Sequence, residues 1–315
     1  MRTFVIANPS AASGRVRRRW SRVEGVLRQR FGAYEVLWTE ASGDGTRLAR
    51  EACQAGATRL VVVGGDGTLN EVVNGLFDAA TDVPYVPDLE LAVYPAGTGG
   101  DFVRSLGVAD DDAEAWGDFT SRAIDVGRVV CRNAQGAEIK RYFVNEASTG
   151  GSGVIVDKVN HTSKRLGGKV SFYVGTLRGL IAYRNQWVRL RVDDAFEQDL
   201  VVNTVVVANG RYFGGSMMVA PEALLDDGLF DIIVIGDVSA ATFVRHSGAL
   251  YRGDHLRLPF FRHLRGSHVR IEPLSGVEPM LLETDGELVG ELAASFAVMP
   301  RALHVLAPWP RGDTR

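Results

Sequence analysis

Residues 61–71 read VVVGGDGTLNE, and this stretch carries the strongest structural signal in the sequence. Three valines run into two glycines, as expected for a buried strand that ends in a tight turn. Asn70–Phe77 is then expected to begin a helix. Glycines at a strand end let backbone N–H groups approach an anion, and the N-terminus of a following helix attracts the same charge. The stretch therefore predicts a phosphate-binding turn, with a plain strand-to-helix turn as the alternative.

The acidic residue inside this turn points to a metal ion. The carboxylate of Asp66 repels phosphate, whereas a Mg²⁺ ion held between the two would remove the conflict. Thr68 adds a hydroxyl donor. The motif is not a Walker A loop, because no Gly-Lys-Ser/Thr follows, and its spacing is not that of the dinucleotide-binding GxGxxG turn.

Strands and helices alternate on both sides of this turn. Short apolar runs predict strands, and helical spacing of apolar residues predicts helices between them. Such alternation favours a parallel sheet with helices on both faces. The predicted strands are Phe4–Ala7, Glu35–Trp38, Leu60–Val63 and Leu91–Tyr94, and the earlier helices are Arg15–Phe31 and Asp44–Ala55.

The pattern changes near residue 125, where strand signals begin to dominate. A helical insert at about Gly168–Tyr183 interrupts them. We therefore expect an α/β domain over 1–125, a mainly antiparallel β-sandwich over 126–300 and a segment over 301–315 that can return to the first domain. The later predicted strands are Tyr142–Asn145, Trp187–Val192, Asn203–Ala208, Asp231–Val234, His268–Ile271 and Ala302–Leu306.

Length and composition agree with two globular domains. The chain has 315 residues and a net charge of −3, so the molecule as a whole is not built to bind nucleic acid. Its two cysteines make neither a disulfide framework nor a zinc site. No signal-peptide pattern and no run of ~18 apolar residues is present. We expect a cytoplasmic protein that meets the inner face of the membrane peripherally; the sequence leaves the oligomeric state open, with a homodimer among the options.

A second glycine-rich segment, PAGTGGDFVRSLG at residues 95–107, follows the predicted strand Leu91–Tyr94. It repeats the first theme, because glycines and a threonine stand at a strand end and Asp101 stands at a helix start. Asp101 is a candidate for positioning Mg²⁺ together with Asp66, and a helix N-cap is the alternative role.

The two motifs carry a resemblance to a known family. GGDGT resembles the superfamily of NAD kinases, 6-phosphofructokinases and diacylglycerol/sphingosine-type lipid kinases. Residues 95–107 look like the P-x-GTGND-FARSLG segment of diacylglycerol kinase catalytic domains, with Gly100 and Val103 in place of the usual Asn and Ala. Segments resembling the same family continue in order at residues 144–148, 214–231 and 284–287.

This resemblance implies a site for ATP in the first domain. Asn8-Pro9 with Ser13-Gly14 resembles the family's N-terminal phosphate loop, with extra residues between the halves. The implied nucleotide-binding residues are Asn8, Pro9, Gly14, Thr39, Gly64, Gly65, Asp66, Gly67, Thr68, Leu69, Asn70, Gly97, Thr98 and Gly99.

The resemblance places the catalytic base in the Asp-Gly-Glu motif. Asp285 and Glu287 are both candidates, because an extended segment would put them on one face and a tight turn would not. Asp66 and Asp101 complete the implied catalytic set.

The resemblance also implies a structural Mg²⁺ ion. Its ligands would be the carbonyls of Leu224 and Leu229 and the carboxylate of Asp227. Mixed oxygen ligands suit this cation, and a plain acidic turn is the alternative.

Residues 245–270 carry six arginines interleaved with leucine, tyrosine and phenylalanine. Such a surface can rest on anionic headgroups, or its apolar residues can enter the core of an ordinary basic loop.

We predict an ATP- and Mg²⁺-dependent lipid kinase whose substrate is most simply diacylglycerol. The alternatives are a sphingoid or other lipid, NAD, or a non-catalytic nucleotide or lipid sensor. Gly100 is consistent with a sensor, whereas the intact acids Asp66, Asp101 and Asp285 favour an enzyme.

Overall fold

A computed structural model describes residues 1–96, 100–108, 119–153, 183–274 and 279–309. The expected nucleotide residues Gly97, Thr98 and Gly99 lie outside these ranges, as does nearly all of the expected helical insert at Gly168–Tyr183. The chain forms two compact units. The first contains Met1–Val126, Gly214–Ser216 and Pro300–Arg315, and the second contains Gly127–Phe213 and Met217–Met299.

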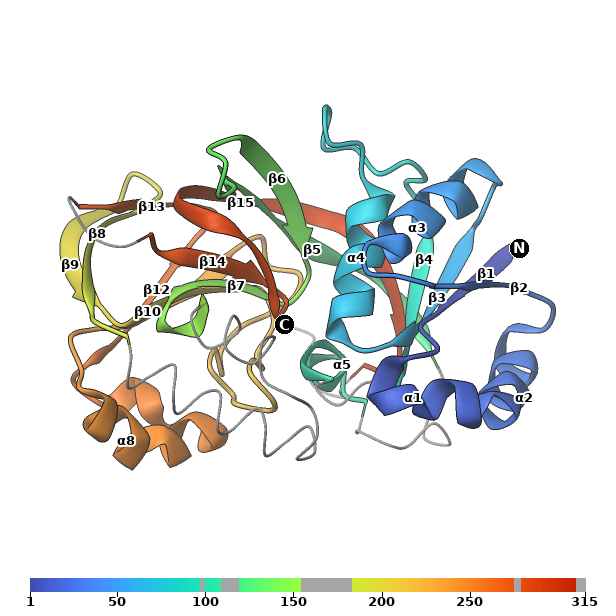
Figure 1. The fold of residues 1–315 in the computed structure, drawn as a ribbon, viewed down its shortest axis with the longest axis horizontal. Helices are drawn as coiled ribbons and strands as arrows, with labels where there is room; N and C mark the ends of the chain where they lie inside the picture. The colour runs from blue at the N-terminus through green and yellow to red at the C-terminus, as the bar shows by residue number, and fades with distance from the viewer. Residues whose placement is uncertain (97–99, 109–118, 154–182, 275–278, 310–315) are drawn as a thin grey trace. The chain divides into compact units, whose positions relative to one another are not determined.

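The first unit is built on a parallel sheet, as the sequence predicted. Strand β1 lies between β2 and β3, and β3 pairs in turn with β4 (Figure 1). The end of the long strand β15 adds to the other side of β4, also in parallel, with His304 opposite Glu90. The strands are β1 (Thr3–Ala7), β2 (Glu35–Trp38), β3 (Arg59–Gly64), β4 (Glu90–Pro95) and β15 (Glu287–Ala307).

Helices connect these strands, and two of their boundaries differ from the prediction. The helix expected over Arg15–Phe31 is interrupted at Arg19, which separates α1 from α2. The helix expected from Asn70 begins four residues earlier, because Gly65 is extended and the chain turns into α4 directly after it. The helices are α1 (Ala11–Arg18), α2 (Trp20–Phe31), α3 (Asp44–Gln54), α4 (Asp66–Leu76) and α5 (Asp101–Ser105).

Helices α3 and α4 lie side by side, which Figure 1 shows beside the sheet. A glycine in α4 permits this close approach, because a Cβ at Gly75 would lie 2.3 Å from the carbonyl oxygen of Thr46. The pair fixes the direction in which α4 leaves the GGDGT turn.

The second unit is mostly antiparallel, as predicted. Its strands surround an apolar core of valine, leucine, isoleucine and phenylalanine side chains. Strand β15 pairs with β14, β13 and β5, so its first half belongs to this unit. The remaining elements are β5 (Thr120–Arg132), β6 (Glu138–Phe143), β7 (Glu146–Gly150), β8 (Gln186–Val192), β9 (Phe196–Val202), β10 (Thr204–Ala208), β11 (Phe230–Ile235), α8 (Ala240–Arg252), η3 (His255–Arg257), β12 (Phe261–Gly266), β13 (His268–Pro273) and β14 (Leu281–Thr284).

The strand expected over Tyr142–Asn145 is divided in the structure. Strand β6 ends at Phe143 and β7 begins at Glu146. The N–H groups of Val144 and Asn145, at the break, donate to the carboxylate of Asp285. At these two residues, hydrogen bonds to a side chain replace the strand pairing that a continuous strand would make.

Residues 245–270 are not the basic loop that the sequence allowed. They form most of α8, the short helix η3, strand β12 and the start of β13. Leu250 is buried, and Phe261 packs against the same small core cluster. Among the described residues, no helix is long and apolar enough to cross a membrane.

Candidate functional site

The GGDGT turn joins β3 directly to α4. Glycine is required at Gly64, because a Cβ there would lie 2.6 Å from the Cβ and Oγ1 atoms of Thr68. Thr68 and Asn70 are buried in the first turn of α4. The Asn8 side-chain amide donates to the hydroxyl of Thr68 at 3.1 Å, which ties the end of β1 to this turn. The predicted residues at the end of β3 and the start of α4 are Gly64, Gly65, Asp66, Gly67, Thr68, Leu69 and Asn70.

Asp66 connects this turn to the second glycine segment, and Asp101 connects that segment to residues 215 and 216. Asp66 Oδ2 accepts the N–H of Gly100 at 2.8 Å and that of Asp101 at 3.4 Å. The carboxylate of Asp101 in turn accepts the N–H groups of Gly215 and Ser216, at 2.9 and 2.7 Å, within the same compact unit. Asp101 is the first residue of α5 and not its N-cap, which is Gly100.

The N-terminal loop after β1 continues into the first residues of α1, whose backbone is not helical. Ala12, Ser13 and Gly14 all have positive φ, at 50°, 59° and 78°. Successive residues of this kind can turn their N–H groups toward one side and form a concavity suited to an anion. The loop borders an open hollow lined by Pro9, Ser10, Ser13, Gly14, Arg17 and Arg18.

The candidate nucleotide residues gather at one edge of the parallel sheet. Asn8 follows β1, Thr39 follows β2 and Gly65 follows β3, so each stands at the carboxyl end of its strand. The N–H of Thr39 donates to the carbonyl of Ala7 at 3.0 Å, and its side chain is buried. Ligands of open α/β sheets bind outside this edge.

The Asp-Gly-Glu motif forms a two-residue hairpin turn between β14 and β15. Asp285 and Gly286 have φ values of 49° and 85°, and Thr284 pairs with Glu287. Asp285 is buried, and its carboxylate accepts three backbone N–H groups, from Val144 at 3.2 Å and from Asn145 and Glu146 at 3.0 Å each. Glu287 is exposed. The tight-turn alternative therefore holds, and the two carboxylates have different surroundings.

Two further acids, which sequence reasoning missed, lie beside this turn. Glu283 and Glu146 are both buried, and their side chains influence each other electrostatically. Glu283 also accepts the hydroxyl of Ser148 and the N–H of Gly286, the latter at 2.8 Å. Burial raises the pKa of Glu283 to about 7, although these hydrogen bonds oppose the rise. An available signal was the position of Glu283, two residues before Asp285 in the sequence.

Comparison with known proteins agrees with these features. The diacylglycerol kinase catalytic domain matches residues 2–129, and the YegS C-terminal NAD kinase beta sandwich-like domain matches residues 146–307. A protein named "Diacylglycerol kinase" from Bacillus subtilis is 29% identical over 99% of this chain and 98% of its own length. A "Probable lipid kinase YegS-like" from Chromohalobacter salexigens is 32% identical, covering 88% of this chain and 84% of its own.

The chain belongs to the diacylglycerol kinase and YegS-like lipid kinase family. It is therefore a phosphotransferase, and membership in this kinase family implies ATP as the phosphoryl donor. The crystal structure of a putative diacylglycerol kinase from Bacillus anthracis has the same fold, with a TM-score of 0.73, 24% identity, and coverage of 97% of this chain and 96% of that one.

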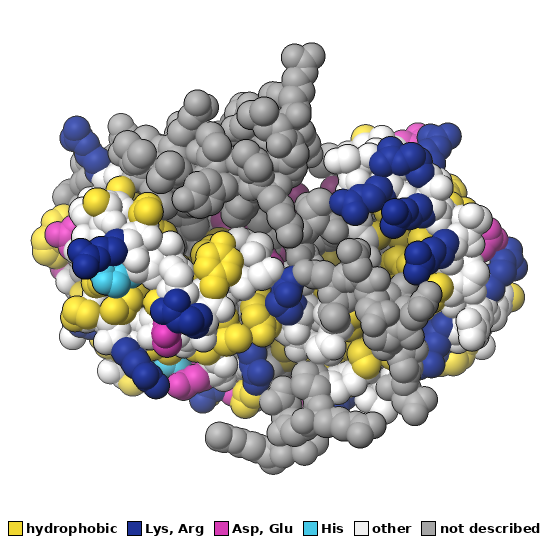
Figure 2. Space-filling view, turned by 90° about the horizontal axis from the view of Figure 1, so that it is seen from below, with side chains coloured by type: hydrophobic (Ala, Val, Ile, Leu, Met, Phe, Trp, Pro, Cys, Tyr) yellow, Lys and Arg dark blue, Asp and Glu magenta, His cyan; other side chains and the backbone are white. Residues whose placement is uncertain are grey.

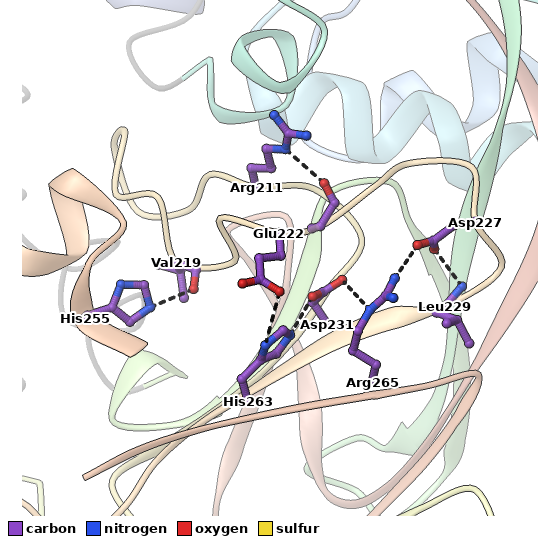
Figure 3. Close-up of polar contacts among 10 residues, drawn as sticks. Arg211, Val219, Glu222, Asp227, Leu229, Asp231, His255, His263 and Arg265 are labelled. Carbon is purple, nitrogen blue, oxygen red and sulfur yellow. Dashed lines mark hydrogen bonds and ion pairs between the residues drawn. The ribbon is translucent and has the colours of Figure 1, made fainter. Parts of the chain in front are cut away.

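In this lipid kinase, the turn expected to hold a structural Mg²⁺ has a different arrangement (Figure 3). The Nη2 atom of Arg265 contacts Asp227 Oδ2, and the N–H of Leu229 donates to Asp227 Oδ1 at 3.1 Å. Both carboxylate oxygens thus face hydrogen-bond donors, one of them cationic. Asp227, Leu224 and Leu229 do not fit a metal ion at this carboxylate while Arg265 is in place.

Proposed function

We propose that this lipid kinase transfers the γ-phosphate of ATP to a hydroxyl of diacylglycerol, forming phosphatidic acid, with Mg²⁺ as the metal ion. The observation that supports it most is the full-length similarity to a protein named diacylglycerol kinase, together with the phosphate-binding geometry at the ends of β1 and β3. Phosphoryl transfer depends on positioning and on neutralising phosphate charge, and the first unit has the parts for both.

The triphosphate is assigned to the two loops after β1 and β3. The N-terminus of α4 supplies backbone N–H groups and a positive dipole end, and the left-handed residue Ser13 adds its own N–H group. Arg17 and Arg18 line the hollow beside them, and their charges favour a polyanion.

Mg²⁺ would be positioned by Asp66, with Asp101 behind it. Their oxygens are the hard ligands that Mg²⁺ prefers, and this ion commonly keeps several waters. Because Asp66 Oδ2 accepts backbone N–H groups of residues 100 and 101, its carboxylate also fixes the second glycine segment against the first. Mg²⁺ would neutralise phosphate charge during transfer.

We assign the proton-accepting role to Asp285. Three backbone N–H groups fix its carboxylate in one position, which suits a group that must orient a hydroxyl. Glu287 is exposed at the start of β15, where it is accessible to a ligand, and it is assigned to substrate positioning.

The lipid is approached from an anionic membrane surface. On α8 and after it, Arg245 and Arg257 are exposed, as are the apolar side chains of Val244 and Tyr251. Figure 2 shows Lys and Arg side chains interspersed with hydrophobic ones on the face of the molecule seen there. Each basic residue near anionic headgroups contributes about 1 kcal/mol. Other arginines of residues 245–270 are engaged within the protein, namely Arg252, Arg262, Arg265 and Arg270.

A different lipid acceptor is the second candidate, since relatives of comparable similarity are named YegS-like lipid kinases and not diacylglycerol kinases. The two candidates share the catalytic residues and differ in the acceptor. The test presents γ-labelled ATP and Mg²⁺ with diacylglycerol, monoacylglycerol, ceramide or sphingosine in mixed micelles, and with NAD in solution.

Label in phosphatidic acid is the expected result, and label in another lipid would replace the substrate. In parallel, Asp285→Asn should lower kcat by about 10²–10⁴-fold while ATP binding persists, as for loss of a general base. Glu287→Gln is the matched variant, expected to change KM more than kcat. Full activity in Asp285→Asn would contradict the role of Asp285 as the base and would leave the proposed acceptor lipid unchanged.

A further inference from the structure

The side chain of an arginine on β12 contacts the turn before β11, where a metal ion was expected. Strand β12 pairs with β11 in a register that places Arg265 opposite Asp231. From there the side chain reaches back to the turn, where Nη2 contacts Asp227 Oδ2. Its Nε atom lies 3.6 Å from Asp231 Oδ2 (Figure 3). One guanidinium therefore spans the carboxylate of the turn and the carboxylate of the strand that follows.

We propose that Arg265 is the resident cation of this turn, holding Asp227 to Asp231 in place of a divalent metal ion. We further infer that removal of its side chain converts the two carboxylates into a site that takes up Mg²⁺. The inference concerns the second unit alone and does not depend on which lipid is phosphorylated.

The buried carboxylate requires positive charge nearby. The side chain of Asp231 is 1% exposed, and a buried ion without a partner is strongly destabilising. His263 Nε2 lies 2.6 Å from Asp231 Oδ1, while Arg265 faces Oδ2. Each oxygen of Asp231 thus has a nitrogen partner on the neighbouring strand, and no divalent ion is needed to balance it.

The shape of the guanidinium explains how one side chain reaches both acids. Its planar fork carries donors that point in different directions, so Nε and Nη2 serve separate carboxylates. Burial lowers the pKa of Arg265, but the charges of Asp231 and Asp227 outweigh this effect and raise it. The guanidinium is therefore held in its charged form.

The same geometry excludes a metal ion at Asp227. Mg²⁺ binds oxygen ligands at about 2.0–2.1 Å in near-octahedral geometry. Asp227 Oδ2 already faces a cationic nitrogen, and Oδ1 faces the N–H of Leu229. An ion at either oxygen would be repelled by Arg265, whereas a shortened side chain would leave the carboxylate without a cationic partner.

The test compares melting temperatures in EDTA and in millimolar Mg²⁺, without nucleotide. Arg265→Ala is compared with Arg262→Ala, a matched control on the same strand whose side chain contacts Gln198 and Phe196 and pairs with no acid among the described residues. We expect the melting temperature of the wild type to be unchanged by Mg²⁺, and likewise that of Arg262→Ala. Arg265→Ala should melt several degrees lower in EDTA and recover at least half of that loss as Mg²⁺ saturates.

Three further variants keep the result interpretable. Arg265→Ala/Asp227→Asn should lose the response to Mg²⁺, which assigns the ion to this carboxylate. If Arg265→Ala does not fold, Arg265→Lys and Arg265→Gln replace it. Lysine keeps the positive charge but lacks the planar fork of the guanidinium, whereas glutamine lacks the charge. In EDTA, the melting temperature of Arg265→Lys should lie between those of the wild type and Arg265→Gln.

Three outcomes would overturn the proposal. One is a saturable rise in the wild-type melting temperature with Mg²⁺ that disappears in Asp227→Asn, because the ion would then bind beside Arg265. Another is an Arg265 variant that melts like Arg262→Ala. The third is an Arg265→Ala protein that melts lower but does not respond to Mg²⁺, since the carboxylates would then form no cation site.

Discussion

Replacing Glu283 by glutamine should stabilise the protein at alkaline pH. Glu283 is completely buried beside Glu146, and its pKa in the folded protein is raised to about 7 from an ordinary value of 4.5. A raised pKa means that the folded state prefers the protonated acid. The stabilising effect of that proton is fully present below pH 4.5 and is lost as the pH rises through 7.

The magnitude follows from the two pKa values. Their difference, at about 1.4 kcal/mol for each tenfold change in proton affinity, corresponds to about 3 kcal/mol at pH 8. Glutamine resembles the protonated acid, because it is uncharged and its carbonyl can still accept the N–H of Gly286. The variant should therefore be more stable than wild type by up to about 3 kcal/mol at pH 8, and about equal to it at pH 4.5.

Urea unfolding followed by circular dichroism at pH 5, 6, 7 and 8 measures this difference. Glu138→Gln, an exposed position on β6, is the matched control and should leave the pH dependence of stability unchanged. Parallel curves for wild type and Glu283→Gln over the whole pH range would refute the reasoning, because the buried acid would then titrate as it does in the unfolded chain.

Three other predictions concern the first unit and the cysteines. Gly64→Ala should lower the unfolding free energy by about 1–3 kcal/mol through overpacking and should raise the ATP dissociation constant, both measurable by thermal titration with nucleotide. Asp125→Ala should destabilise the protein by about 1–3 kcal/mol in urea unfolding, because it removes the buried carboxylate that accepts the N–H of Arg301 at 2.7 Å. Burial raises the pKa of the Cys53 and Cys131 thiols to about 11, so both should react with a thiol reagent at pH 8 far more slowly in the native than in the urea-unfolded protein.

The strand–turn–helix units could be predicted because their signals are local. The valines before Gly64 and the glycines after them specify β3 and its turn with residues that are adjacent in the chain. The start of α4 was placed too late, since Asp66 and Gly67 have poor helix propensity and only the cap geometry brings them into the helix. Glycine loops and alternation were therefore sufficient for the α/β fold class.

The surroundings of the candidate catalytic acids could not be predicted in the same way. The choice between Asp285 and Glu287 depended on the turn, for which Asp-Gly between strands was a usable hairpin signal. The burial of Glu283 depends on the pairing of β14 with β7, whose residues lie far apart in the sequence. No local pattern reports such a contact.

The arginine-rich stretch shows the same limitation. Its composition suggested a membrane surface, but Arg265 is opposite Asp231 only because β12 pairs with β11 in one particular register. A shift by one residue would turn this side chain to the other face of the sheet. The contact between Arg265 and Asp227 therefore depends on the tertiary structure and could not be predicted from the charge pattern of the sequence.

The first unit is built from three separate segments of the chain, which has a consequence for expressing it alone. A fragment ending at residue 126 would lack the strand that pairs with β4 through His304 and Val305, and it would lack the backbone donors that hold Asp101. The exposed edge of β4 would then be open to other chains, which favours aggregation. Expressing the first unit by itself therefore requires circular permutation or a grafted final strand, because its segments are separate in the sequence and come together only in the folded chain.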